Sequence, residues 1–238
     1  MTENVIVTAK RSRMTAGDRR TAILDVAAEL LSTHPWEEVT VALLLEGAGI
    51  SKGGFYHHFT SKEDVLEALL LRFTDACTAA GQAVHERSPG GAVARFTAYL
   101  GGTTRWELDH AEKIMAVIRI AMMAGNESIF LKLEEESRQR ATPLLRRLVA
   151  DGVRERAFDV IDIDMTVSLL QHTWRMRWVV LAQARQLCVE GDVAGGWAML
   201  EDRLSLEERM TNRLLGCSAV APVRMPESEE FRGFLTSG

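Results

Sequence analysis

Apolar residues follow a helical spacing along most of this chain, and the alternation typical of strands is nearly absent. In the first such segment the apolar positions run from Ile23 to Leu31, and the His34-Pro35 pair ends the pattern. Further along, the spacing predicts longer helices, in which Pro143 should kink or divide the third. These helices are expected at about 91–108, 110–124, 127–156, 162–188 and 196–215. The fold class is therefore predicted to be all-α.

Two short predicted helices with a glycine turn between them lie near the N-terminus. Thr40 is a good N-cap for the first and Ser51 for the second, and Gly49 lies where a turn requires a residue that tolerates positive φ. This layout over residues 40–59 is typical of a helix-turn-helix, whose second helix places its N-terminal side chains in the major groove of DNA. A plain αα-hairpin has the same spacing, so spacing alone leaves both interpretations open.

Charge is unevenly distributed along the chain. The 238 residues carry a net charge of −5, which by itself argues against a nucleic-acid partner. Within residues 10–20, however, five basic residues oppose only Asp18, and they include Arg11, Arg13 and Arg19. This basic arm suits phosphate binding, and a solvated terminus would have the same composition.

The rest of the composition narrows the class of protein. Hydrophobic residues make up 47% of the chain, enough to bury a sizeable core. The three cysteines are too far apart for a zinc site or a disulfide framework. Neither a signal peptide nor a membrane span is evident. We therefore expect a cytoplasmic protein without a cofactor, a bound metal or a membrane partner.

The segment AGISKGGFYHHFTSKEDVLEALL makes the helix-turn-helix interpretation specific. It is similar to the signature of the TetR (tetracycline repressor) family of regulators, and the resemblance covers roughly residues 18–73. It implies an all-α homodimer with N-terminal DNA-binding heads and a C-terminal domain for a small-molecule inducer. Together with the helical pattern it divides the chain into a basic arm (1–17), a DNA-binding domain (18–73), a ligand-binding and dimerisation domain (74–216) and a loose tail (217–238).

By position, the resemblance also assigns contacts with DNA. It implies that phosphate is contacted by Thr40, Tyr56 and Lys62. It implies that the groove is contacted by Ser51, Lys52, Gly53, Gly54 and His57. Sequence-independent affinity through counterion release is expected from Lys52, Lys62, Arg11, Arg13 and Arg19.

Two features depart from the family pattern. Leu45 replaces a residue that is usually small, which is expected to open the packing of the second helix on the third slightly. The Gly53-Gly54 pair weakens the third helix by about 1 kcal/mol and removes a side chain from its reading face. Few side chains are then left to read bases, so more of the affinity should come from phosphate contacts.

The C-terminal half contains two strongly apolar segments. Residues 165–187 are apolar nearly all round, which predicts that they are covered on more than one side. A second stripe runs from Trp197 to Leu214. Two such helices from each subunit would form a four-helix bundle about a two-fold axis. That dimer would bind a palindromic DNA operator with half-sites about 34 to 36 Å apart or somewhat further.

Methionines and aromatic residues between the head and this interface are candidates for an effector pocket. Soft thioethers and aromatic faces suit an adaptable apolar site, and an arginine or histidine could orient one polar group of the ligand. Core packing is the better explanation for any single one of these residues. The candidate set is Trp106, His110, Met115, Arg119, Met122, Met123, Trp174 and Trp178.

The sequence therefore predicts a DNA-binding regulator, and by resemblance a repressor released from its operator by a small, largely apolar ligand. A DNA-binding scaffold controlled by a protein partner would have the same head. A helical-bundle metalloenzyme is disfavoured, because Glu107 and His110 form one E-x-x-H pair where a di-iron bundle needs two. No nucleophile or nucleotide-binding motif points to catalysis either.

Overall fold

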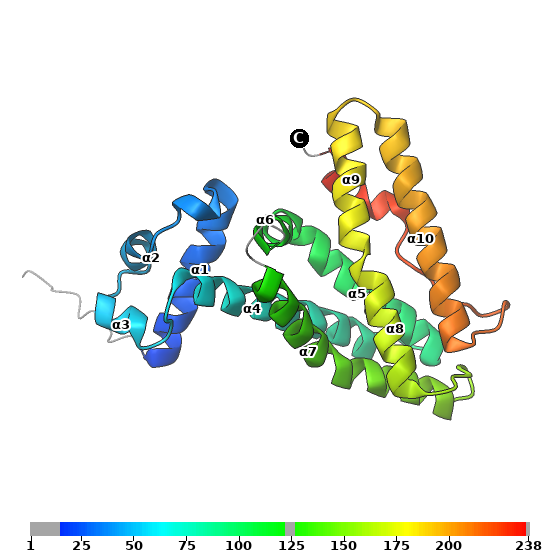
Figure 1. Ribbon diagram of the computed structural model, residues 1–238. Coiled ribbons are helices and arrows are strands. Elements are labelled where there is room, and N and C mark those ends of the chain that lie inside the picture. Colours follow the sequence, from blue (N-terminus) through cyan, green and yellow to red (C-terminus); the bar gives the residue numbers. More distant parts are fainter. Residues whose placement is uncertain (1–14, 122–126, 237–238) are drawn as a thin grey trace, which may run out of the picture. The chain divides into compact units, whose positions relative to one another are not determined.

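The computed structural model describes residues 15–121 and 127–236, and within these ranges it contains helices and no strand (Figure 1). The chain divides into two compact units, Met1–Leu69 and Leu70–Gly238. The predicted all-α fold, with a helix-turn-helix head and a larger helical bundle, is confirmed. In the described ranges no helix is both long enough and apolar enough to cross a membrane.

The first unit is a small helical domain whose boundaries follow from local capping. Thr15 and Asp18 form a reciprocal capping box at the start of its first helix, and Pro35 follows the end of that helix. Its core includes the fully buried Ile23, Leu44 and Phe55. The elements are α1 (Ala16–Thr33), the 3₁₀ helix η1 (Trp36–Glu38), α2 (Val41–Ala48), α3 (Lys52–Tyr56) and the beginning of α4 (Lys62–Arg87).

Two glycines shape the turn between α2 and α3. Gly49 has a φ of +63° and ends α2 in the left-handed region, as its position in the sequence predicts. Gly47 lies against α1, where an added Cβ would stand 2.6 Å from Cγ1 of Val26. The absence of a side chain at Gly47 therefore lets α1 and α2 approach closely.

The second unit is a bundle of longer helices (Figure 1). The contacts between α9 and α10 are the most extensive, and α7 packs on α8. Two clusters of buried apolar side chains form the core, one around Phe96 and Leu145 and one around Leu181 and Leu200. The elements are the remainder of α4, then α5 (Ala92–Asp109), α6 (Ala111–Ala121), α7 (Glu127–Arg154), α8 (Ile163–Arg175), α9 (Arg177–Val189), α10 (Val193–Leu215), η2 (Ser228–Phe231) and α11 (Arg232–Thr236).

Two helix predictions in this unit need correction, and a third is narrowed. The helix expected at 162–188 is two helices, α8 and α9, which meet at Met176. Both halves are apolar, so the hydrophobic pattern runs across the break without marking it. The helix expected from residue 196 begins at Val193, because the Asp192 side chain caps the N–H of Gly195. Of the two outcomes predicted for Pro143, a kink or a division of the helix, division is excluded because α7 is continuous.

The prediction of a loose tail over residues 217–238 is wrong for the part that the structure describes. We call residues 217–236 the strap. Its Val223, Met225 and Phe231 are buried, and the Asn212 side chain of α10 bonds both the N–H and the C=O of Val223 at 2.8 Å. The apolar residues of 217–227 have no helical spacing, and the helical spacing of Phe231, Phe234 and Leu235 extends over a single turn, so the sequence pattern does not predict that the strap packs.

Candidate nucleic-acid interface and effector site

The second helix of the head presents its first turn to solvent. Phe55 and Phe59 are buried and fix α3 on the core of the first unit, as their apolar character predicts. The Ser51 side chain accepts a hydrogen bond from the N–H of Gly54 at 3.2 Å and caps the helix. The Thr40 hydroxyl caps α2 in the same way, through the N–H of Leu43 at 3.2 Å. Both hydroxyls are thus placed by the caps that the sequence indicates.

The predicted groove residues converge on this turn, together with the predicted phosphate contact Tyr56. Lys52, Gly53, Tyr56 and His57 are exposed, whereas Gly54 is half-buried beneath Ser51. The Lys52 ammonium lies 6.0 Å from the centre of the Tyr56 ring, so the cation and the aromatic ring share one small area. A Cβ added at Gly53 would meet nothing within 4 Å. The first turn of α3 is therefore open to a large partner.

Lys62, a predicted phosphate contact, has a different position in the structure. Its ammonium donates to the backbone carbonyls of Trp36 and Val39 at 2.9 Å each and of Glu37 at 3.4 Å. It also lies 5.7 Å from the centre of the Trp36 ring. A lysine has three N–H donors, and all three are directed at η1 and the residue after it. This geometry gives the ammonium partners within the fold, so that Lys62 ties the start of α4 to η1, and it favours that role over the predicted phosphate contact.

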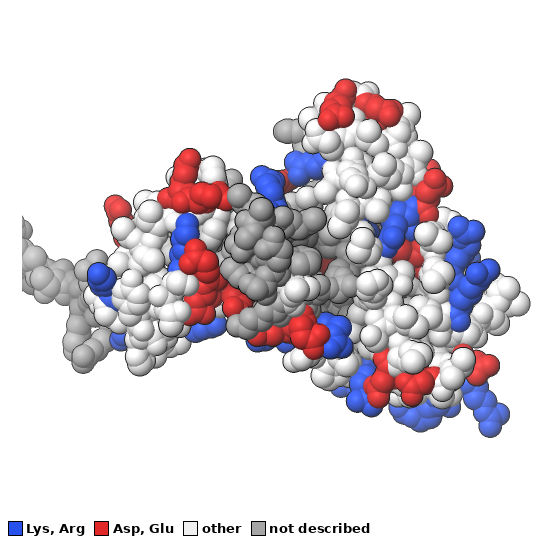
Figure 2. Space-filling view, in the orientation of Figure 1, with Lys and Arg blue, Asp and Glu red and all other residues white. Residues whose placement is uncertain are grey.

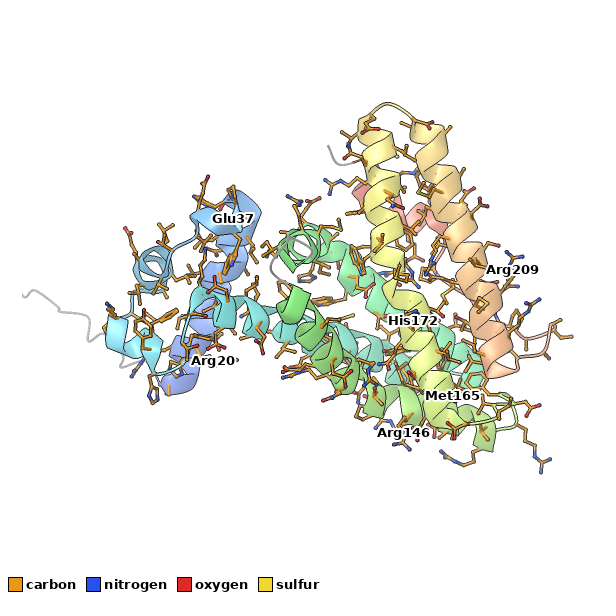
Figure 3. All side chains as sticks on the ribbon, viewed as in Figure 1. Arg20, Glu37, Arg146, Met165, His172 and Arg209 are labelled. Atoms are coloured by element: carbon orange, nitrogen blue, oxygen red, sulfur yellow. The ribbon has the colours of Figure 1, made fainter. Side chains whose placement is uncertain are left out.

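Of the three predicted arginines of the basic arm, Arg19 lies within the described residues, close to His58. The pKa of His58 is lowered, first by burial and then by the nearby charges of His57, Arg19 and Arg20. Arg19 and Arg20 of α1 and His57 at the end of α3 therefore all lie near the His58 ring. Acidic side chains gather elsewhere on the unit, where α1 is followed by η1 (Figure 2) and where Glu37 lies (Figure 3). The predicted arm residues Arg11 and Arg13 lie outside the described residues.

The predicted effector residues fall into separate groups. Trp106 and His110 stack at 4.1 Å between ring centres, and Phe73 lies 6.1 Å from Trp106. Met115 and Trp178 pack together on the core cluster around Leu181 and Leu200.

The remaining predicted effector residues do not join these groups. Trp174 packs on the other core cluster and donates its indole N–H to Thr211 at 3.1 Å. Arg119 is exposed. Met122 and Met123 lie outside the described residues. The structure thus brings half of the predicted set to the α5, α6 and α9 side of the second unit.

Sequence reasoning missed a buried group of charges in this unit. Arg177, at the start of α9, is 7% exposed and Glu207 of α10 is 0% exposed, and the two form an ion pair at 2.5 Å. Arg203 pairs with the same carboxylate at 2.6 Å. We call Arg177, Arg203 and Glu207, with the neighbouring Thr104 and Glu107, the buried charge cluster. The sequence did contain a signal, because Glu207 falls on the apolar stripe of α10.

The half-buried Glu107 joins α5 to α4 and α9. Its carboxyl accepts from the Cys77 thiol at 3.8 Å and from the Trp178 indole. Burial raises the pKa of Glu107, and the Arg177 charge partly opposes that rise. Burial and the Glu107 carboxyl in turn raise the pKa of the Cys77 thiol. Because the His110 ring bonds the backbone of Trp106, the E-x-x-H pair is engaged in contacts within the fold.

Known proteins share both the head and the overall fold. The family model described as "Bacterial regulatory proteins, tetR family" matches residues 23–69. The HTH-type transcriptional repressor KstR2 of Rhodococcus jostii is 29% identical over 168 residues, which are 67% of this chain and 79% of that protein. The HTH-type transcriptional regulator EthR of Mycobacterium tuberculosis is 40% identical over 77 residues, which are 32% of this chain and 36% of that protein.

A solved structure adds evidence on the fold alone. The fatty acid degradation regulator FadR from Bacillus halodurans superposes with a TM-score of 0.58 at 17% sequence identity, over 86% of this chain and 97% of that one. The family model matches residues of the first unit, and the structural match is long enough to extend over both units. Residues 23–69 match the TetR family of bacterial regulatory proteins, and with these relatives they identify the chain as a DNA-binding transcriptional regulator.

Proposed function

We propose that this protein is a homodimeric repressor that binds a palindromic operator and is released from it by a small, largely apolar ligand. The observation that carries the proposal is the exposed first turn of α3, where Lys52, Gly53 and Tyr56 lie together on a helix fixed from behind by Phe55. The relative KstR2, which is named a transcriptional repressor, supports the sign of regulation. In this proposal residues 18–73 bind DNA and residues 74–216 bind the effector and the second subunit.

At the operator, we assign the exposed Lys52 to a phosphate. The absence of a side chain at Gly53 lets the backbone approach the DNA, while Ser51 and His57 reach base edges in the major groove. Thr40 and Tyr56 add contacts with the sugar-phosphate backbone. Because few of these groups can distinguish bases, the operator should be bound with a large sequence-independent component.

Exposed apolar side chains on α8 and α10 support dimerisation. Met165 and Leu169 of α8 are 66% and 45% exposed, and Met210 of α10 is 38% exposed. Figure 3 shows Met165 and His172 on α8 and Arg209 on α10, and the two helices pack against each other. Large apolar groups left in solvent along two adjacent helices are typical of a subunit interface. A second copy would cover them by forming a four-helix bundle.

The stacked Trp106 and His110 support the ligand part of the proposal. Met115 and Trp178, which pack on the cluster around Leu181 and Leu200, add a thioether and a further aromatic face from the same side of the unit, and this composition suits a mainly apolar molecule with one polar group. The ligand must favour a dimer conformation that fits the operator poorly, since only differential affinity for two states shifts their equilibrium.

The test is selection of bound DNA from a random pool, followed by release of the selected DNA by a panel of apolar metabolites. We expect a palindrome, a dimer by sedimentation, and at least one compound that weakens binding. Leu169→Glu should yield monomers that bind DNA weakly. Leu131→Glu, at a leucine of α7 that is 63% exposed, is the matched control and should stay dimeric. A palindrome bound equally well with every compound would favour the scaffold controlled by a protein partner.

A further inference from the structure

We propose that the effector is an apolar molecule with a carboxylate, and that Arg177 binds this carboxylate in the place that the thioether of Met225 holds in the structure. The inference rests on the proposed function, because it names the ligand class of a ligand-controlled regulator. In this proposal the buried charge cluster binds the polar group of the ligand, and the strap, which carries Met225, moves when the ligand binds.

The two edges of the Arg177 guanidinium are bonded unequally. Nε and Nη2 donate to one oxygen of Glu207, at 2.7 and 2.5 Å. Nη1 donates to the Thr104 hydroxyl at 3.3 Å, and Nη2 also faces the Met225 sulfur at 3.8 Å. A thioether is a weak acceptor, and the bond to Thr104 is long. One edge of a buried cation is therefore left with partners much weaker than a carboxylate.

The charges around Arg177 also call for an anion. Glu207 is shared, because its second oxygen accepts from Nε of Arg203 at 2.6 Å. Arg203 is 17% exposed and also donates to the backbone carbonyl of Thr173, whereas Arg177 is almost completely buried. Each guanidinium thus has one oxygen of Glu207, and within the described residues no second carboxylate bonds the other edge of Arg177. A ligand carboxylate forms short, parallel hydrogen bonds with a guanidinium and would give that edge a strong acceptor.

The buried charge cluster lies beside apolar side chains of both core clusters. Met225 belongs to the core cluster around Phe96 and Leu145. Trp178, the neighbour of Arg177 in the chain, packs on the cluster around Leu181 and Leu200. Of the predicted effector residues, Trp106 precedes Glu107 on α5 and His110 is the C-cap of that helix. A ligand whose carboxylate reaches Arg177 would therefore bury the rest of its body among apolar side chains.

The strap supplies a route to the site. It joins the bundle through side chains: the N–H of Met225 donates to Glu208 at 2.9 Å, and the N–H of Arg224 donates to the Thr97 hydroxyl at 3.1 Å. Residues 217–227 of the strap have no helix of their own. Met225 can thus leave Arg177 when a few side-chain bonds break, with every helix intact. Because α11, at the end of the strap, packs on α9, such a shift would reach one of the bundle helices.

The first test places a carboxylate on the strap itself. Met225→Glu should pair with Arg177, whereas Met225→Gln has nearly the same shape without the charge. We expect the Glu variant to melt about 2 to 4 °C above the Gln variant at pH 7, the shift of roughly 1 kcal/mol in a domain of this size. A lower melting temperature for Met225→Glu would show that the cluster is already neutral and would overturn the inference.

The second test uses ligands on the full-length protein bound to its selected DNA. Decanoate and decanamide share one chain length and differ in charge. Decanoate should release the DNA at a concentration at least tenfold lower than decanamide, within the usual range of allosteric coupling. In the Met225→Glu variant this difference should vanish, and DNA affinity without ligand should fall about tenfold relative to Met225→Gln.

The outcomes separate this inference from the proposed function. Equal potency of the two probes, or release by neutral compounds alone, would overturn the role of Arg177 and leave a ligand-controlled repressor standing. DNA binding that responds to no compound in the broad panel would overturn the proposed function itself. If decanoate still releases DNA from the Met225→Glu variant at a lower concentration than decanamide does, the carboxylate is recognised at a site other than Arg177.

Discussion

The two units of the molecule use cationic side chains in different ways. In the first unit Lys52 is exposed on a single turn of α3, on a helix fixed by the buried Phe55. In the second unit Arg177 is almost completely buried and is paired with Glu207, thirty residues away in the sequence. An exposed cation in water is available to a polyanion and contributes little to folding, whereas a buried cation depends on its partners. In the proposed function the same kind of charge serves recognition in the first unit, whereas in the second it joins helices of the bundle.

Lys62 shows that this contrast depends on the partners of a cation as much as on its unit. It lies in the DNA-binding unit, but its ammonium is directed at three backbone carbonyls around η1. Its role is therefore closer to that of Arg177 than to that of Lys52. Substitutions that separate stability from DNA binding test this distinction directly.

The largest expected effect comes from removing the shared carboxylate of the buried charge cluster. Glu207→Ala leaves Arg177 and Arg203 without their anion in the interior, and should lower the free energy of unfolding by about 3 to 5 kcal/mol. Urea denaturation measures the loss. The control is Glu135→Ala, because Glu135 forms an ion pair with Arg138 on the exposed side of α7. We expect no measurable change there, and an equally small effect at Glu207 would contradict the account.

A smaller loss of stability is expected at Lys62. Lys62→Ala removes charged hydrogen bonds to η1, and hydrogen bonds of this kind contribute about 1.5 to 3 kcal/mol. Lys52→Ala, the exposed counterpart in the same unit, should leave the melting temperature unchanged. If the two variants have the same stability, the assignment of Lys62 to folding is wrong.

Alanine at either of two helical glycines with open surroundings should raise the free energy of unfolding by about 1 kcal/mol. A Cβ added at Gly53 of α3 or at Gly101 of α5 meets nothing within 4 Å. Both Gly53→Ala and Gly101→Ala should therefore raise the melting temperature. Only Gly53→Ala should weaken DNA binding, because its methyl group faces the DNA. If the two variants bind DNA equally well, Gly53 does not lie against the DNA.

The smallest effect is a pH dependence in the first unit. The pKa of His58 lies below its ordinary value of 6.5, so the folded state favours the neutral ring. The stabilisation is present above pH 6.5 and is lost as the pH falls through the lowered folded pKa. The melting temperature of the wild type should fall slightly more between pH 7.5 and pH 5 than that of His58→Gln. Identical falls would show that His58 does not contribute.

The head could be predicted from the sequence because its determinants are local. Thr40 and Ser51 cap helices that begin at the next residue, and Gly49 ends α2 with the expected positive φ. All the residues of the exposed turn lie within one short segment. A pattern of caps, turns and apolar spacing therefore predicts both the fold of this segment and its candidate contacts.

The site in the second unit could not be predicted in the same way. Its residues come from α5, α9, α10 and the strap, and no spacing along the chain relates Glu107 to Arg177 or to Met225. The break at Met176 was hidden because apolar residues continue across it. The role of Lys62 was missed for a related reason, since its acceptors are carbonyl oxygens, which every residue has. Glu207, a charge on an apolar stripe, was the one local signal available.

The central claim is that the exposed turn of α3 binds DNA and that Lys52, rather than Lys62, neutralises phosphate there. The most direct test is the slope of log K against log salt concentration, where K is the association constant of the protein for the selected operator. Since each protomer of the dimer would lose one phosphate contact, Lys52→Ala should reduce the steepness of this slope by about two. Lys62→Ala should keep the wild-type slope. An unchanged slope in Lys52→Ala, or a reduced one in Lys62→Ala, would contradict the account.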